Sequence, residues 1–278
     1  MGLNFDKVGI IYNADIKGAF ETAQKIAKKF NKSKLFTSDK MGSDVSFAIV
    51  VGGDGTILKA ARKYAKYDVP IFGFNLGRLG FLAQARPEDI DFVAKKISSG
   101  DFRIEERIML ECKLGHKGCK TLIALNDMVI RGAIFSRTSM LELFINDSPT
   151  SAYLADGLII STPTGSTAYS LSAGGPILAP NLDCFTITAI CPHTLSARPL
   201  VIPAKEKMTV KLGEGNKFQI TADGQDGVEI SKEVEIQKHA KAAKLLLLNS
   251  SNKGADEFYS VLREKMHWGK APQSGGSG

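Results

Sequence analysis

The sequence lacks any hydrophobic run approaching the about 20 residues that a membrane-spanning helix requires. Asp6 and Lys7 interrupt the N-terminal segment before a signal-peptide hydrophobic region could form. With 278 residues, 44% hydrophobic and 23% charged, the composition is that of a globular chain with one large or two medium domains. We therefore expect a cytoplasmic protein with no membrane partner.

Cysteine is also scarce, with four residues in the chain. Cys112, His116 and Cys119 have the spacing of zinc ligands, but the residues between them resemble a hairpin turn and no fourth ligand is near. Free thiols in a reducing compartment are the interpretation that we favour over structural zinc. The chain is accordingly expected to contain no metal-binding residues of its own.

The net charge of +7 does not form a concentrated basic patch. Many of the lysines between positions 25 and 34 lie on and just after one amphipathic helix, a pattern typical of a solvated face. A dispersed positive balance suits small polyanionic substrates better than nucleic acid. We expect no nucleic-acid partner.

Two common phosphate-binding motifs are missing. A P-loop needs a lysine after its glycines, and none follows Gly52, Gly53 and Gly55 at the required spacing. A dinucleotide fingerprint needs a glycine-rich turn after the first strand, but Val8–Asn13 continues into residues 14–17 without one. Any phosphate chemistry must therefore use a different loop.

The segment Gly52–Thr56 is the candidate for that loop. It follows the apolar, β-branched run Phe47–Val51 and precedes a helix-forming stretch, which predicts a strand, a glycine turn and a helix. Glycines and a helix N-terminus let backbone amides approach a phosphate. Asp54 within this loop indicates a general base or a metal ligand, with a helix-capping aspartate as the structural alternative.

The organisation of the chain changes near residue 102. Strands and helices alternate over 1–101, which predicts a doubly wound α/β domain. Successive strands over 102–252 predict an all-β domain, so the fold class is α+β overall. A helix over 255–267 can return to the first domain, and 270–278 reads as a flexible tail. The strands predicted in the second domain include Thr121–Ile130, Val228–Ile236 and Leu245–Leu248.

Two further segments carry candidate ligand contacts. The loop Asn75–Leu82 follows a strand and should share a crevice with Gly52–Thr56, because the carboxyl ends of parallel strands meet at one edge. Phe81 in this loop is either core or a pocket wall. The run Thr162–Pro176 is rich in small hydroxyl side chains and glycine and contains Tyr169, a composition suited to recognising a nucleotide.

Taken together in this order, the motifs resemble those of bacterial NAD kinases, the ATP-NAD kinase family. The first motif alone is shared with lipid kinases and, loosely, with phosphofructokinases, whereas the run Thr162–Pro176 singles out the NAD kinases. The resemblance extends over essentially the whole chain. It is carried by Gly52–Thr56, Asn75–Leu82, Asn126-Asp127, Asp156-Gly157, Thr162–Pro176, Cys191–His193, Arg198–Leu200 and Asp223–Gln225.

The resemblance implies transfer of the ATP γ-phosphoryl group to the 2′-hydroxyl of the adenosine ribose of NAD, which gives NADP. Asp54 matches the proposed general base. A divalent metal, Mg²⁺, is implied as a companion of ATP. Relatives of this kind form homodimers or homotetramers, in which His193 can act across the subunit boundary. NAD and ATP are the implied small-molecule partners.

The resemblance also assigns residues to the binding of NAD. Asp127 stands where many bacterial members have Glu, which is one methylene longer, so its contact can be shifted or made through a water. Leu154 departs from the Arg or Gly often found at its position, so both NAD and NADH stay open as acceptors. The donor is likewise either ATP or polyphosphate. The implied set is Asp54, Gly55, Phe81, Asn126, Asp127, Arg137, Leu154, Asp156, Thr164, Thr167, Ala168, Tyr169, Ser170, Leu171, Ser172, His193 and Gln225.

Two other classes of protein are weighed against this interpretation. A lipid kinase with the same loop would be expected to have an apolar acceptor cleft or a membrane-facing surface, and the sequence has no clear one. A non-catalytic NAD(P)-binding regulator would not need Asp54. Both expectations favour the dinucleotide kinase.

Overall fold

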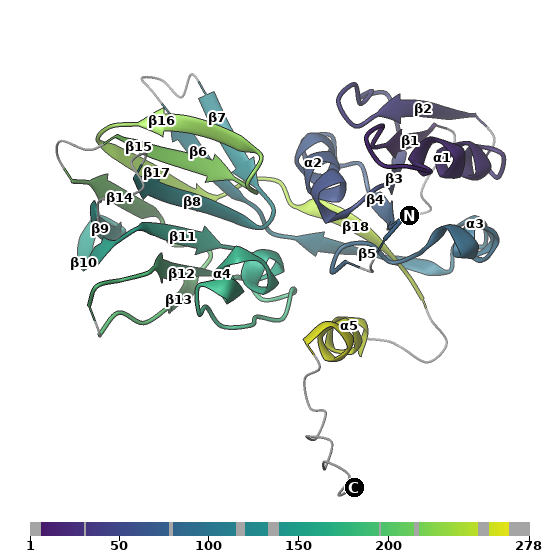
Figure 1. Ribbon diagram of the computed structural model, residues 1–278. Helices are drawn as coiled ribbons and strands as arrows, with labels where there is room; N and C mark the ends of the chain where they lie inside the picture. Colours follow the sequence, from purple (N-terminus) through teal and green to yellow (C-terminus); the bar gives the residue numbers. More distant parts are fainter. Residues whose placement is uncertain are drawn as a thin grey trace, which may run out of the picture.

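The computed structural model describes residues 7–30, 32–77, 80–114, 120–132, 139–194, 196–213, 217–249 and 256–266. An α/β layer and a β-sandwich lie beside each other, joined by two long neighbouring strands (Figure 1). Among these described residues, none of the helices is both long and apolar enough to cross a membrane.

The α/β layer is built on a six-stranded sheet that is parallel except at one edge. The apolar run predicted as a strand at Phe47–Val51 is buried at every position, because helices cover both faces. Helix α2 (Asp54–Ala65) packs on one face, and α1 (Ala19–Ala27) and α3 (Ile90–Ser98) pack on the other. The strand order is β2 (Ser33–Thr37), β1 (Val8–Tyr12), β3 (Phe47–Val51), β4 (Ile71–Phe74), β18 (Ala243–Leu248) and β5 (Phe102–Arg107).

The sandwich consists of two six-stranded sheets whose inner faces share one hydrophobic core. One sheet runs β10 (Ser148–Ala155), β9 (Ser139–Ile145), β14 (Met208–Leu212), β17 (Glu233–Lys238), β6 (Leu110–Leu114) and β7 (Lys120–Ala124). The other runs β13 (Leu200–Pro203), β12 (Cys184–Ile190), β11 (Gly157–Ser161), β8 (Asp127–Gly132), β15 (Phe218–Ala222) and β16 (Asp226–Ile230). The alternation of apolar and polar residues in strands such as β14 and β15 fits one buried face and one exposed face.

Two strands from the range assigned to the all-β domain lie in the sheet of the α/β layer. Strand β5 and strand β18 fall in the range assigned to the all-β region, but they pair antiparallel with each other along the edge of the α/β sheet. The chain therefore leaves the first layer after β5, builds the sandwich, and returns through β18. The mixed polar and apolar sequence of β5 gives no sign of this, whereas the continuous apolar run of β18 is typical of a strand covered on both faces.

Two predicted strands are each broken in two. Thr121–Ile130 divides at Leu125-Asn126 into β7 and β8, which lie in different sheets of the sandwich. Val228–Ile236 divides at Ser231-Lys232 into β16 and β17. In both cases a continuous β-forming sequence crosses from one sheet to the other at a two-residue bend.

The predicted C-terminal helix is α5 (Asp256–Met266). It approaches the α/β layer at the loop after β4, where the rings of Phe258 and Phe81 have centroids 6.4 Å apart. The side chain of Lys265 lies over the same Phe81 ring, with its ammonium 4.9 Å from the ring centroid. The helix thus lies against the junction of the two layers (Figure 1).

Candidate active site

The glycine loop lies where β3 ends and α2 begins. Gly53 is the N-cap residue of α2 and has extended backbone angles, and Asp54 is the first helical residue. The turn is tight, since a Cβ atom on Gly52 would lie 2.5 Å from Oγ1 of Thr56. The N-terminal amides of a twelve-residue helix are therefore available at this edge of the sheet.

The carboxylate of Asp54 packs against the loop that follows β4. Its Oδ2 accepts a hydrogen bond from the backbone N–H of Phe81 at 3.2 Å. Its Oδ1 is buried and has no hydrogen-bond partner within the described part of the chain. A buried carboxylate oxygen without a partner is costly, and its retention is typical of a functional site.

Gly80 makes this arrangement possible. A Cβ atom at this position would lie 1.8 Å from Oδ1 of Asp54 and 2.3 Å from its Cγ. No side chain can be accommodated there without displacing the carboxylate. The two loops predicted to share one crevice are thus in direct contact.

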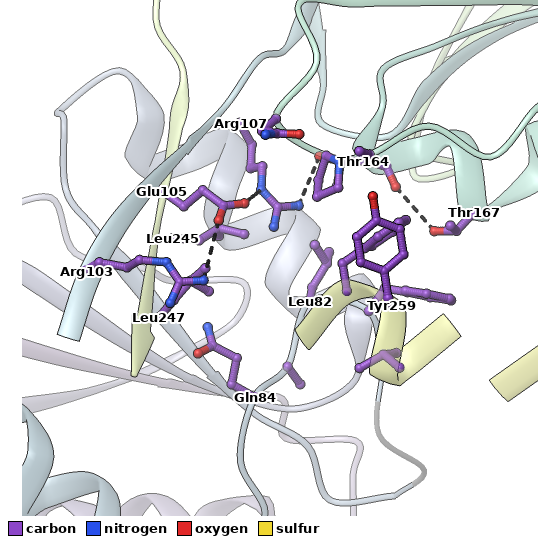
Figure 2. Close-up of a pocket in the computed structure, with 17 residues that line it drawn as sticks. Leu82, Gln84, Arg103, Glu105, Arg107, Thr164, Thr167, Leu245, Leu247 and Tyr259 are labelled. Atoms are coloured by element: carbon purple, nitrogen blue, oxygen red, sulfur yellow. Dashed lines mark hydrogen bonds and ion pairs between the residues drawn. The ribbon is translucent and has the colours of Figure 1, made fainter. Parts of the chain in front are cut away.

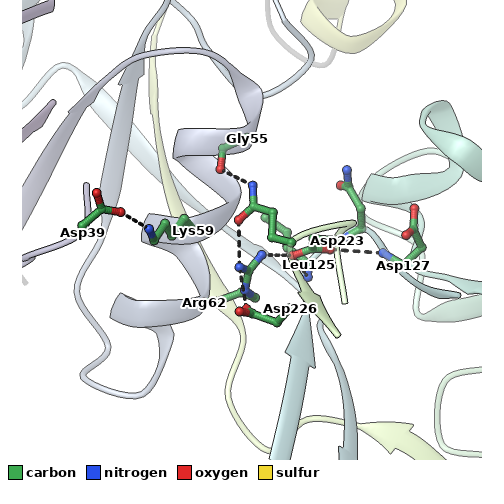
Figure 3. Close-up of polar contacts among 10 residues, drawn as sticks. Asp39, Gly55, Lys59, Arg62, Leu125, Asp127, Asp223 and Asp226 are labelled. Atoms are coloured by element: carbon green, nitrogen blue, oxygen red, sulfur yellow. Dashed lines mark hydrogen bonds and ion pairs between the residues drawn. The ribbon is translucent and has the colours of Figure 1, made fainter. Parts of the chain in front are cut away.

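A polar network joins α2 to the turn between β15 and β16 (Figure 3). Arg62 donates from Nη1 to Asp223 at 2.7 Å, and from Nη2 to Gln225 and Asp226 at 2.9 Å each. Gln225 in turn donates from Nε2 to the carbonyl of Gly55 at 2.8 Å. The glycine loop and the sandwich are therefore tied together by side chains from both layers.

Asp223 supports the segment that carries Asn126 and Asp127. Its carboxylate accepts hydrogen bonds from the backbone N–H groups of Leu125 at 3.1 Å, Asn126 at 2.7 Å and Asp127 at 3.3 Å. The side chain is fully buried, and Arg62, only 10% exposed, supplies the opposite charge. A buried carboxylate with this many donors is a fixed structural acceptor.

The hydroxyl-rich run forms two short helical turns, Thr164–Thr167 and α4 (Tyr169–Ser172). Most of its hydroxyls bond within the protein: Thr162 donates to the carbonyl of Leu125, and Ser161 donates to that of Asn126. Gly165 packs on the same segment so closely that an added Cβ atom would lie 2.1 Å from the carbonyl oxygen of Asn126. The run therefore packs against the Asn126-Asp127 segment and supports it.

The predicted ligand residues divide among cavities around the junction. A cavity of about 290 Å³ is lined in part by Asn126, Asp127, Ala168 and Tyr169. A groove of about 550 Å³ in front of the glycine loop is lined in part by Gly53, Gly55, Thr56, Lys59, Arg62 and Gln225. Figure 2 shows a third cavity, of about 200 Å³, in which Thr164, Thr167 and Tyr259 line one side and Arg103, Glu105 and Arg107 the other.

Three predicted residues form a separate group at the opposite end of β11. The carbonyl of Leu154 accepts a hydrogen bond from the N–H of His193 at 2.8 Å, and Asp156 follows at the exposed bend before β11. Ser161, beside the Asn126 segment, is at the other end of this strand. A five-residue strand is about 16 Å long, so the group lies about that far from the junction.

The remaining predicted residues differ in their surroundings. Ser170 is fully buried, and its hydroxyl shares a hydrogen bond of 3.2 Å with Thr188 of β12. Leu171 is half-buried and Ser172 exposed on α4. Phe81 is half-buried beside Asp54, and Arg137 lies outside the described residues, as do His116 and Cys119.

Sequence reasoning missed the part played by Lys59 and Arg62. They lie three residues apart on α2, so they share the helix face that borders the glycine-loop groove. Their position directly after Gly52–Thr56 was the available signal, but charges on an amphipathic helix are usually interpreted as a solvated face. The sequence singles out Asp223 only as part of the motif Asp223–Gln225 and gives no sign that it accepts hydrogen bonds from three amides.

Burial and the neighbouring Asp223 raise the pKa of Asp127 to about 7. The unfolded chain ionises such a group near pH 3.8, so the folded protein holds this proton more tightly. The resulting contribution to stability is fully present below pH 3.8 and is lost as the pH rises through about 7. The loss amounts to at most about 4 kcal/mol.

We expect Asp127→Asn, which cannot ionise, to remove this pH dependence. The melting temperature of the variant relative to the wild type should rise between pH 5 and pH 7 and then level off. Thermal unfolding in matched buffers across that range measures the difference. A difference that stays constant with pH would mean that Asp127 does not carry the effect.

The aspartate in a glycine loop between an α/β layer and a β-sandwich is the arrangement expected of the class of kinases whose loop the sequence resembles. A family model described as the ATP-NAD kinase N-terminal domain matches residues 14–102, and one described as the ATP-NAD kinase C-terminal domain matches residues 125–248. The chain belongs to the ATP-NAD kinase family.

Individual relatives agree with this assignment. An NAD kinase of Heliobacterium modesticaldum is 38% identical over 95% of this chain and 99% of its own length. An NAD kinase of Natranaerobius thermophilus is 39% identical over 84% of this chain and 82% of its own length. A solved NAD kinase from Archaeoglobus fulgidus, in complex with ATP, is 25% identical, with a TM-score of 0.76 over 92% of this chain and 97% of that one.

Proposed function

We propose that this protein transfers the γ-phosphoryl group of ATP to the 2′-hydroxyl of the adenosine ribose of NAD, with Asp54 as the general base. The observation that carries the proposal is the buried, unpartnered Oδ1 of Asp54 in a loop tied by hydrogen bonds to the Asn126-Asp127 segment. Family membership supports NAD and ATP as the substrates.

The dinucleotide would lie along the sandwich side of the junction. Asn126, Asp127, Ala168 and Tyr169 line one cavity and suit the adenosine half, which brings its ribose toward Asp54. NAD has two nucleotide halves and is elongated. The group formed by Leu154, Asp156 and His193, one strand length away, therefore suits the nicotinamide half.

The phosphates of ATP suit the groove in front of the glycine loop. Backbone amides at the start of α2 supply positive field there, whereas the ammonium of Lys59 is paired with Asp39 at 2.5 Å. Asp15 and Asp39 line the same groove, and one or two carboxylates together with phosphate oxygens are what Mg²⁺ requires. When bound with ATP, the metal would neutralise charge on the phosphates.

In the chemical step, the ribose 2′-oxygen forms a bond to the γ-phosphorus of ATP as the bond to the bridging oxygen of ADP breaks. Asp54 accepts the proton of the attacking hydroxyl, and NADP and ADP are released. Positioning and electrostatic stabilisation supply most of the acceleration in phosphoryl transfer. The protein's main task would thus be to hold the ribose and the γ-phosphate in line.

We also propose that the protein is a cytoplasmic homo-oligomer. Leu182 is 44% exposed, and Val201, on the edge strand β13, is 45% exposed, so the sandwich offers apolar surface to a second copy. His193, exposed beyond the end of β12, would then face the partner's site.

Incubating the protein with NAD, ATP and Mg²⁺ and assaying NADP tests the proposed activity. Parallel reactions with NADH and with polyphosphate decide the acceptor and donor. Chelation should abolish the activity while the melting temperature is unchanged, because the metal accompanies ATP and is not part of the fold. Absence of NADP from the complete reaction would contradict the proposal.

Tyr169→Ala should raise the KM for NAD about 10- to 100-fold, with a smaller effect on kcat. The ring is 40% exposed and lines the cavity with Asn126 and Asp127, where it can stack on a base. Such stacking contributes about 1–3 kcal/mol. Steady-state kinetics with Tyr67→Ala as the control, a similarly exposed ring on another surface, measures the effect. A collapse in melting temperature with unchanged KM would instead mark Tyr169 as a packing residue.

A further inference from the structure

We infer that Arg62 is a positioning residue that sets the distance between Asp54 and the segment holding the acceptor. This inference rests on the proposed function and assigns a role to a side chain that sequence analysis did not single out. Arg62 lies two helical turns beyond Asp54 on α2 and lines the groove in front of the glycine loop.

Arg62 connects the two layers through buried groups. Its guanidinium bonds to Asp223 at 2.7 Å, where the two side chains are 10% and 0% exposed. An exposed ion pair can be lost with little consequence, whereas an unpaired charge at this depth is strongly unfavourable. The position of α2 relative to the β15–β16 turn is therefore fixed by this pair.

The Arg62–Asp223 pair contacts residues of the site on both of its sides. On the sandwich side, Asp223 holds the backbone N–H groups of Asn126 and Asp127. On the α/β side, Arg62 orients the amide of Gln225, whose Nε2 bonds to the carbonyl of Gly55, next to Asp54. Figure 3 shows this chain of contacts running from Gly55 through Arg62 to Asp127.

The geometry of these contacts requires an arginine at position 62. Two of its nitrogens serve three acceptors at once, Asp223, Gln225 and Asp226. A lysine keeps the positive charge but presents a single nitrogen, so it cannot hold the planar fork that spaces these groups. Arg62→Lys should preserve the charge balance and disturb the geometry.

The test compares kcat and KM for Arg62→Lys and Arg62→Ala with the wild type. A displacement of about 1 Å in a reacting pair can lower the rate by about 10²-fold. We expect Arg62→Lys to lower kcat by about that factor while the KM for NAD changes less than kcat does. Added ethylguanidinium should restore part of the kcat of Arg62→Ala, because it can occupy the vacated position between the same acceptors.

The control is Lys66→Ala, at the exposed C-terminal end of the same helix, which should leave kcat and KM unchanged. If the wild type makes NADP and Arg62→Lys keeps kcat within threefold, the inference is wrong although the proposed function stands. A lower melting temperature with normal kcat would likewise reduce Arg62 to a structural role. Failure of the wild type itself to make NADP would instead refute the proposed function.

Discussion

Asp54→Asn is expected to lower kcat by about 10²–10⁴-fold, the usual contribution of a general base, while NAD still binds. The asparagine keeps the size of the side chain and an oxygen for the N–H of Phe81, from which Asp54 accepts a hydrogen bond at 3.2 Å. It cannot take the proton of the ribose hydroxyl. The loss should therefore appear in turnover and not in binding.

Calorimetry of NAD binding beside the rate of NADP formation separates the alternatives for this residue. The control is Asp91→Asn, which changes an exposed carboxylate paired with Lys29 on the far side of the α/β layer. Turnover within a few-fold of the wild type would mean that Asp54 only begins the helix. Loss of metal–ATP binding together with turnover would identify it as a metal ligand.

Gly80→Ala should reduce turnover nearly as much as Asp54→Asn does, although it replaces no ionisable group. The added Cβ would be placed 1.8 Å from Oδ1 of Asp54, so either the carboxylate or the loop must move. Displacing a reacting group by about 1 Å costs on the order of 10²-fold in rate. Steady-state kinetics on the purified variant gives the comparison.

Gly77→Ala in the same loop is the matched control, since among the described residues the nearest atom to its Cβ would be Oδ1 of Asn75 at 3.7 Å. That variant should keep both turnover and melting temperature. If Gly80→Ala turned over NAD like the wild type, the contact between the two loops would not constrain the base.

The parts of the site that sequence could predict are those fixed by short-range chemistry. The strand, glycine turn and helix around Gly52–Thr56 are present with Asp54 at the helix start. The loop holding Phe81 meets it because parallel strands end at one edge. The α+β fold class is also confirmed by the fold and by the family.

The remaining features depend on contacts between distant segments. The run Thr162–Pro176 was predicted from its composition to recognise a nucleotide, and in the structure the hydroxyls of Thr162 and Ser170 bond to the carbonyl of Leu125 and to Thr188. Composition cannot distinguish these uses, because a hydroxyl that binds a ligand and one that supports a loop have the same donor and acceptor. The acceptor role of Asp223 is hidden for a similar reason, since its partners are about a hundred residues away.

Sheet membership is only partly carried by local sequence. Strand β18 has the continuous apolar run of a strand covered on both faces, and it pairs parallel with β4 and antiparallel with β5. Its order within the sheet follows from the chain's return to the first layer. The break of β7 from β8 similarly depends on Asp223, which binds the amides at the bend.

Transfer to the 2′-hydroxyl can be tested by following the γ-phosphoryl group of isotopically labelled ATP, with phosphorus NMR and mass spectrometry of the dinucleotide product. We expect one labelled phosphate, on the 2′-oxygen of the adenosine ribose, and one ADP for each NADP formed. Label appearing only in inorganic phosphate, or on any other hydroxyl of NAD, would contradict this expectation.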